Sequence, residues 1–156
     1  MSFATLRDNT ETILKSVTDI GKVYPFRRST LFWEDFFTRH TDRGRVRNWE
    51  ISRIALASEL EGELPLFRDR HLMTITGWMS LDDTVPTEPI FQGLIESIRT
   101  KFREGDNKFL GRTAGEQNSI INIDLQVVTI DFITFGGQAV HFCEIQFEAE
   151  ERDFTT

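Results

Sequence analysis

The chain has 156 residues, of which 39% are hydrophobic, so it is long and apolar enough to fold as one domain without crosslinks. Its 25 acidic residues outnumber its 18 basic ones, and the formal net charge of −7 disfavours a surface that wraps nucleic acid. The lone cysteine, Cys143, excludes an internal disulfide framework and favours a reducing compartment. No apolar run reaches the roughly 20 residues of a membrane-spanning helix, so we expect cytoplasmic synthesis and no membrane contact.

The N-terminal part predicts a helix, a short strand and an irregular segment. Apolar residues recur at helical spacing over residues 3–20, and Gly21 suits the position just past the helix end. The following GKVYPF predicts a short strand, which Pro25 places at a sheet edge or a strand end. Residues 27–46 mix aromatic residues with arginines, and we interpret them as an excursion with one helical turn over residues 31–37.

Two strands follow, over residues 48–60 and 71–81, and residues 61–70 link them with turn residues and charge. In the second strand, the odd-numbered positions from His71 to Met79 form the expected core face.

A helix and a long loop come next. Thr87 is the expected N-cap, and the helix runs to about Phe102 with a single apolar stripe. Residues 103–119 contain three glycines and little periodicity, which predicts a long loop before the last two strands.

The C-terminal part predicts a β-hairpin, with Gly136 and Gly137 supplying the positive φ angles of a two-residue turn. The first strand is apolar at odd positions up to Val127, and the phase flips at Val128. A β-bulge at Val127–Val128 keeps one continuous core face, because it inserts one extra residue opposite the partner strand. The resulting register places Phe132 opposite His141, Ile130 opposite Cys143, Val128 opposite Ile145 and, beyond the bulge, Leu125 opposite Phe147.

That register turns four apolar residues near the hairpin tip away from the core: Ile133, Phe135, Val140 and Phe142. A cluster of this size predicts a contact surface for another subunit or a partner. The alternative is that the long loop or the N-terminal helix of the same chain covers these residues.

A second candidate surface is basic and consists of Arg43, Arg45 and Arg47, whereas the C-terminal EIQFEAEERDF is acidic. Opposite charges on one chain allow head-to-tail assembly, with a solvated charged face as the alternative.

Motifs for catalysis, cofactors or metals are missing from the sequence. His40, His71 and His141 lack the paired spacing of metal ligands, and no glycine-rich phosphate loop occurs. His141 and Cys143 lie two residues apart on one strand, about 6.5–7 Å, too far for direct activation of the thiol. We therefore expect a protein that is not an enzyme and has no catalytic, cofactor-binding or metal site.

The elements in order are α-β-β-β-α-β-β, which predicts an α+β fold. We expect one domain over residues 1–156, with a mostly antiparallel sheet of four to five strands and two helices packed on one face.

This order resembles the tail terminator (tail completion) proteins of long-tailed bacteriophages. The similar pieces are FATLRDNTETILKSV, GKVYPF, the loop containing WEDFF, NWEISRIAL, HLMTITGWMSL, EPIFQGLIESIRTKF and the hairpin INIDLQVVTIDFITFGGQAVHFCEIQFEAE. The resemblance covers nearly the whole chain and rests on pattern and order. Residues 27–46 are longer than that plan predicts, which leaves their role open.

The resemblance implies a structural virion protein of the phage neck. Such a protein forms a homo-hexameric ring that caps the tail tube, ends its polymerisation and docks to the head–tail connector. Its partners would be other copies of itself, the tail tube protein and a connector or neck protein. DNA would pass through the lumen without specific binding, and no cofactor is implied.

Several alternatives remain open. One is another neck or head–tail joining protein, and another is a non-viral α+β module that binds its partner through the apolar hairpin patch. A further one is an anion- or ligand-binding module, or an enzyme, that uses the open face of the sheet. An RNA-binding sheet fits poorly, because basic and aromatic positions do not interleave on the strands.

Overall fold

The computed structural model describes residues 3–27, 41–42, 45–62, 66–82, 84–105, 107, 119–135 and 137–154. Within these ranges the elements are, in chain order, α1 (Phe3–Lys15), β1 (Lys22–Tyr24), β2 (Thr41–Asp42), β3 (Arg45–Glu61), β4 (Leu66–Ser80), α3 (Thr87–Arg103), β5 (Ser119–Phe135) and β6 (Gln138–Phe154).

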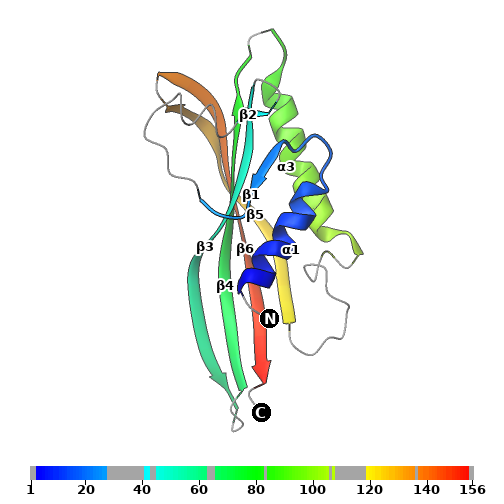
Figure 1. Ribbon diagram of the computed structural model, residues 1–156, viewed down its shortest axis with the longest axis vertical. Coiled ribbons are helices and arrows are strands. Elements are labelled where there is room, and N and C mark those ends of the chain that lie inside the picture. Colours follow the sequence, from blue (N-terminus) through cyan, green and yellow to red (C-terminus); the bar gives the residue numbers. More distant parts are fainter. Residues whose placement is uncertain are drawn as a thin grey trace.

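The strands form a mixed sheet in the order β1-β3-β4-β6-β5, and the short β2 also pairs with β3. All pairs are antiparallel except β1 with β3, which is parallel. Both helices lie on the same face of this sheet (Figure 1). The predicted α+β class and the order of the main elements are therefore confirmed.

The core lies between the two helices and the central strands. In β6, alternate residues from His141 to Ala149 are buried, which is the period-two pattern of a strand with one covered face. The apolar stripe of α3 packs onto these strands, with Phe102 against Phe147 at 5.8 Å between ring centroids. Each such fully buried side chain contributes about 1.5–3 kcal/mol relative to an exposed one.

The sheet is much longer than the helices that cover it. β3, β5 and β6 have 17 residues each, and strands of that length extend roughly 55 Å. α3 also has 17 residues, but a helix rises only 1.5 Å per residue and so covers about 25 Å. The ends of the strands therefore project beyond the helical layer, as the lower part of β3 and β4 does in Figure 1.

Two predicted element boundaries are wrong. α1 ends at Lys15, not near residue 20, because Ser16 N–H and Val17 N–H bond to carbonyls three residues back and Asp19 then takes a positive φ of 59°. Val17 and Ile20 stay buried because the chain turns there without leaving the core. β4 begins at Leu66, so much of the expected link over residues 61–70 is strand.

Thr87 is not the N-cap of α3. The cap is Pro86, whose side chain makes no capping bond, and Thr87 is the first helical residue. Its side chain is buried and its Oγ1 lies 2.8 Å from Nε2 of His141. The hydroxyl that we expected to cap the helix thus links α3 to β6.

The predicted β-bulge is confirmed by a register shift between Val127 and Thr129. Phe132 pairs with His141 and Ile130 with Cys143, as expected. The expected pairing of Val128 with Ile145 is wrong by one residue. Val127 takes that position, so Val128 is the extra residue. A second irregularity between Asn122 and Gln126 contains Leu125, which is nevertheless buried.

The expected helical turn over residues 31–37 lies outside the described residues, as does most of the excursion and of the loop over residues 103–119.

Candidate interface surfaces

The apolar set predicted at the hairpin tip lies on the sheet face opposite the helices but is not an exposed cluster. Val140 is only 1% exposed, and Ile133 and Phe142 are half-buried. The ring of Phe142 packs against Trp78 of β4 at 5.9 Å. The side chain of Phe135 lies outside the described part of the chain. Burial of Val140 removes it as a candidate for direct contact with a partner in this conformation.

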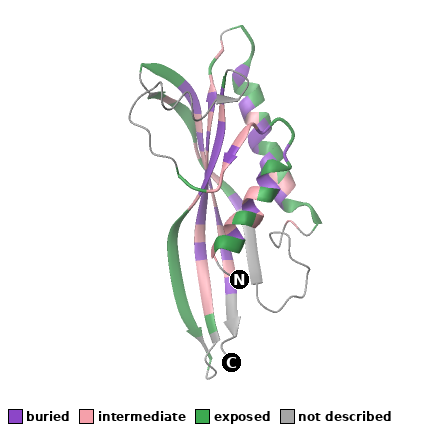
Figure 2. Ribbon diagram, viewed as in Figure 1, coloured by how far each residue is buried: buried purple, intermediate pink, exposed green. Residues whose placement is uncertain are grey.

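Among the hairpin residues whose side chains are described, the exposed large apolar ones are three other residues of β5. Val128, Ile130 and Phe132 are 53%, 43% and 53% exposed. Ile130 and Phe132 share the helix-side face with their β6 partners, Cys143 and His141, because directly paired residues point the same way. α3 covers the β6 partners but leaves the β5 residues open, and in Figure 2 the tip of the hairpin is largely green. We call Val128, Ile130 and Phe132 the tip patch.

A ring stack joins the tip patch to the core. The imidazole of His141 lies 5.3 Å from the ring of Phe91 and 5.0 Å from that of Phe132. Burial lowers the pKa of His141 from its usual value, and the nearby Glu88 opposes this shift. The imidazole is therefore held in its neutral form, which suits its contact with the Thr87 hydroxyl.

A second exposed apolar surface, which the sequence did not lead us to predict, lies at the opposite end of the sheet. Leu56, Leu60 and Phe67 are 49%, 62% and 42% exposed. They share one face of the projecting β3–β4 arm, since Leu56 pairs with His71 and Leu60 with Phe67. We call these three residues the arm patch. Leu56 and Leu60 recur at even positions of the expected strand over residues 48–60, which indicates that they share one face. Phe67 falls in residues 61–70, which the sequence predicts to be a link, so the sequence does not place it beside them.

The outer edge of β3 is also open along the arm. β1 pairs only with Asn48, Trp49 and Glu50, and β2 only with Arg45 and Val46. Among the described strands, nothing pairs with the outer side of β3 from Ile51 to Glu61. An edge of this length presents unpaired N–H and C=O groups that readily accept another strand.

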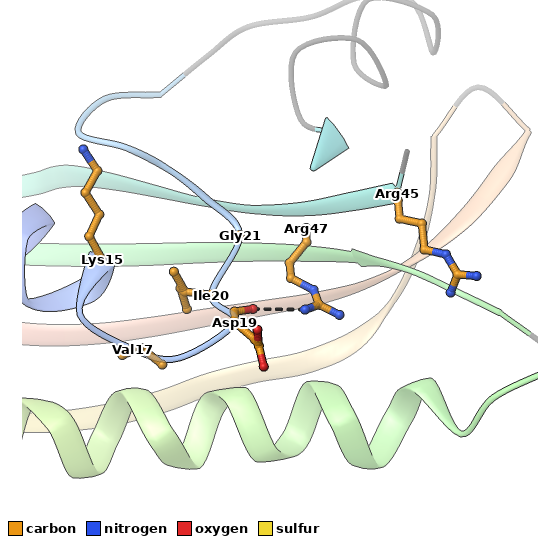
Figure 3. Close-up of a pocket in the computed structure, with 7 residues that line it drawn as sticks. All are labelled: Lys15, Val17, Asp19, Ile20, Gly21, Arg45 and Arg47. Carbon is orange, nitrogen blue, oxygen red and sulfur yellow. Dashed lines mark hydrogen bonds between the residues drawn. The ribbon is translucent and has the colours of Figure 1, made fainter. Parts of the chain in front are cut away.

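Two of the three predicted arginines line a hollow beside the loop between α1 and β1 (Figure 3). Arg43 is outside the described residues, whereas Arg45 and Arg47 both line the hollow, which has a volume of about 550 Å³. Its remaining lining residues are Lys15, Val17, Asp19, Ile20 and Gly21. Basic side chains on an apolar floor suit an acidic or mixed partner segment.

Each arginine of the hollow already makes a polar contact within the chain. Arg47 donates from Nη1 to the carbonyl of Asp19 at 3.0 Å, and Arg45 Nη1 lies 2.6 Å from Oδ2 of Asp82. Hydrogen bonds from Thr84, with a smaller contribution from Arg45, hold the pKa of Asp82 below its usual value. The Asp82 carboxylate is therefore engaged by Thr84 and Arg45.

Gly21 fixes the shape of the hollow. It has a φ of +85°, and a Cβ at this position would lie 2.5 Å from the carbonyl oxygen of Arg47. Only glycine allows the loop to press this closely on β3.

Cys143 is fully buried, and burial raises the pKa of its thiol to about 12. A thiol of this kind stays protonated at neutral pH and is a poor nucleophile.

No protein-family model matches the chain, and a search of curated proteins found no match. None of the described helices is long and apolar enough to cross a membrane. The functional proposal therefore rests on the surfaces described above and on the resemblance in element order.

Proposed function

We propose that the protein is a structural component of a phage neck that assembles as a ring on the end of the tail tube. The ring, hexameric by the resemblance, ends tube polymerisation and offers its other face to the head–tail connector. It performs no chemistry and requires no cofactor.

The observation that carries this proposal is the pair of apolar surfaces at opposite ends of one long sheet. The tip patch and the arm patch lie at opposite ends of the sheet, so a contact of one patch with the other joins different surfaces of two copies. Contact between two different patches is heterologous, and a heterologous contact generates a closed ring or an open helix. A terminator needs the closed form.

The basic hollow adds a charged surface to these two apolar ones. Arg45 and Arg47 offer cations beside the apolar Val17 and Ile20 of the hollow. Asp131 lies between Ile130 and Phe132 in the sequence, but it pairs with Phe142 and therefore points to the opposite face of the sheet. A net charge of −7 over the whole chain also lets DNA pass a lumen without adhesion.

The experiment that tests the function measures tube length. Purified tail tube protein is polymerised with and without this protein, and the tubes are imaged. A terminator is expected to shorten the length distribution and to label one end of each tube. Tubes of unchanged length without a bound cap would contradict the proposal.

Phe132→Asp is the variant for this experiment, because it places a charge in the tip patch. Gln126→Asp is its matched control, since Gln126 is exposed on the same strand but pairs with Gln146 on the other face. Only the Phe132 variant should lose the effect on tube length.

A different neck protein is the second candidate, favoured by the basic hollow, which suits an acidic segment of a connector protein. This candidate predicts binding to connector assemblies without an effect on tube length. A non-viral binding module, also acting through the tip patch, predicts a stable monomer with one partner.

A further inference from the structure

We propose that Asp69, His71 and Glu151 form a binding site for one divalent transition-metal ion of the Zn²⁺ class. This site is separate from the hairpin tip and borders the arm patch, since Leu56 pairs directly with His71. It lies on the helix-side face of the sheet, where the arm emerges from beneath α1.

The three side chains come from two central strands in register. Asp69 of β4 is directly opposite Glu151 of β6, and His71 is two residues further along β4 on the same face. One nitrogen or oxygen atom of each lies within 4.8 Å of the other two. Because central strands hold all three residues, the donor set is already assembled without a loop having to fold around the ion.

The distances within the cluster match those between ligands of one ion. Nε2 of His71 and Oε2 of Glu151 are 3.2 Å apart. Two ligands bound tetrahedrally at about 2.1 Å from a zinc ion lie roughly 3.4 Å apart. Oδ1 of the half-buried Asp69 accepts a hydrogen bond from Ser58 Oγ at 2.5 Å, so for Asp69 to become the third ligand its carboxylate must turn towards the ion or bind it through its other oxygen.

The charges of the cluster also favour a cation. Like charges directly opposite each other on neighbouring strands destabilise a sheet, and Asp69 and Glu151 are such a pair. His71 and Glu151 are only 3% and 6% exposed, so water screens them poorly. An ion between the two carboxylates turns this repulsion into attraction.

The identity of the donors selects the metal. One imidazole with two carboxylates suits Zn²⁺ or Mn²⁺, whereas Mg²⁺ prefers oxygen ligands and keeps its waters. Three protein ligands leave a fourth position for water, as in open zinc sites.

Arg53 is the group that competes with the ion. Its Nη1 lies 3.4 Å from Nδ1 of His71, and its guanidinium lies 4.2 Å above the ring of Phe3. A guanidinium can only donate, so Nδ1 accepts and Nε2 carries the proton in the metal-free protein. When Nε2 binds the ion, the proton moves to Nδ1, and Arg53 must swing away.

The test uses the full chain with Zn²⁺ as the probe. Calorimetry is expected to show one saturable site per chain, with no binding of Mg²⁺ at ten times the concentration. Co²⁺ should give the visible absorbance of an ion in a site with nitrogen and oxygen ligands. Zn²⁺ should also raise the melting temperature, since it binds only the folded chain.

Variants separate this site from adventitious binding. Loss of supporting groups around metal ligands costs about 10–100-fold in affinity, so Asp69→Asn and His71→Gln should each cost at least roughly 100-fold. Glu150→Gln is the matched control, because Glu150 is the neighbouring carboxylate on the opposite face and pairs with Arg70. Arg53→Gln should tighten binding, because it removes a positive charge and offers Nδ1–H an acceptor.

The proposal is overturned if Zn²⁺ gives no saturable binding. It is also overturned if Asp69→Asn and Glu150→Gln bind equally well. Should His71→Gln fail to fold, the half-buried Asp69→Asn decides the outcome alone.

Discussion

Trp49 and Gly77 pack closely together across two neighbouring strands of the core. The two residues pair directly across β3 and β4, and a Cβ on Gly77 would lie 2.3 Å from the indole ring. The same indole donates from Nε1 to the carbonyl of Ile20 at 2.9 Å and lies 6.0 Å from the ring of Phe91. Glycine here makes room for a side chain that ties the sheet to the chain after α1 and to α3.

Gly77→Ala is expected to destabilise the protein by about 1–3 kcal/mol, because a fully buried ring has no free space into which to move. Urea unfolding followed by circular dichroism measures the change. Gly93→Ala is the matched control, since Gly93 is an exposed helical residue with open space around it. That variant should gain up to about 1 kcal/mol from helix propensity. Equal effects of the two variants would contradict this account of Gly77.

Cys143 should not react in the folded protein. With a pKa of about 12 and no exposure, its thiol offers neither thiolate nor access at pH 8. Incubation with iodoacetamide followed by mass spectrometry should show an unmodified native chain and one adduct after denaturation in urea. Rapid modification of the native chain would show that β6 opens around this residue.

His141 should make stability depend on pH near neutrality. Its folded pKa lies below the usual 6.5, so the unfolded chain takes up a proton first as pH falls. The contribution to the free energy of unfolding is therefore full above the unfolded pKa and is lost as pH falls through it. Between about pH 7.5 and 5.5, wild type should lose more stability than His141→Gln. Parallel pH profiles for the two proteins would contradict this prediction.

At the scale of elements, the long periodic segments were predictable from the sequence. Apolar residues recur every three to four positions in α3 and at alternate positions in β6, because each element buries one face. The period of apolar residues in a sequence therefore indicates both the element type and its buried face. The flip of phase at Val128 predicted the bulge, because a strand cannot change its buried face without one extra residue.

What the sequence did not predict depends on contacts between elements. The end of α1 and the role of Thr87 are set by packing against β3 and β6, which no local pattern encodes. Ile130 and Phe132 are exposed because α3 covers β6 and leaves these residues of the neighbouring strand β5 open. Val140 is buried although it lies on the face opposite the helices, and no local pattern indicates this. The sequence therefore predicted most of the strand register correctly. It did not predict which apolar residues near the tip are exposed and which are buried.

The arm is an element that should contribute to assembly more than to stability. Leu60 is the most exposed residue of the arm patch, so Leu60→Asp should change the free energy of unfolding by less than about 0.5 kcal/mol. The same change should abolish association at concentrations where wild type associates. Ala57→Asp, on the other face of the same strand, should do neither. Unfolding and sedimentation measurements on both variants check this, and normal association of Leu60→Asp would exclude the arm patch.

At the scale of the whole molecule, the two helices cover only the middle of a sheet that runs on at both ends. The uncovered ends carry the tip patch, the arm patch and the open edge of β3. A monomer with all three exposed is prone to unspecific association. A closed ring protects the ends of every copy at once, which is why the central claim of this account is assembly.

Sedimentation velocity over a concentration series, with and without magnesium, tests that claim most directly, followed by negative-stain imaging of any large species. The account predicts a discrete species of about six subunits with a central hole, lost in Phe132→Asp and in Leu60→Asp. A single monomeric species at every concentration, with no ring on purified tail tubes, would contradict it.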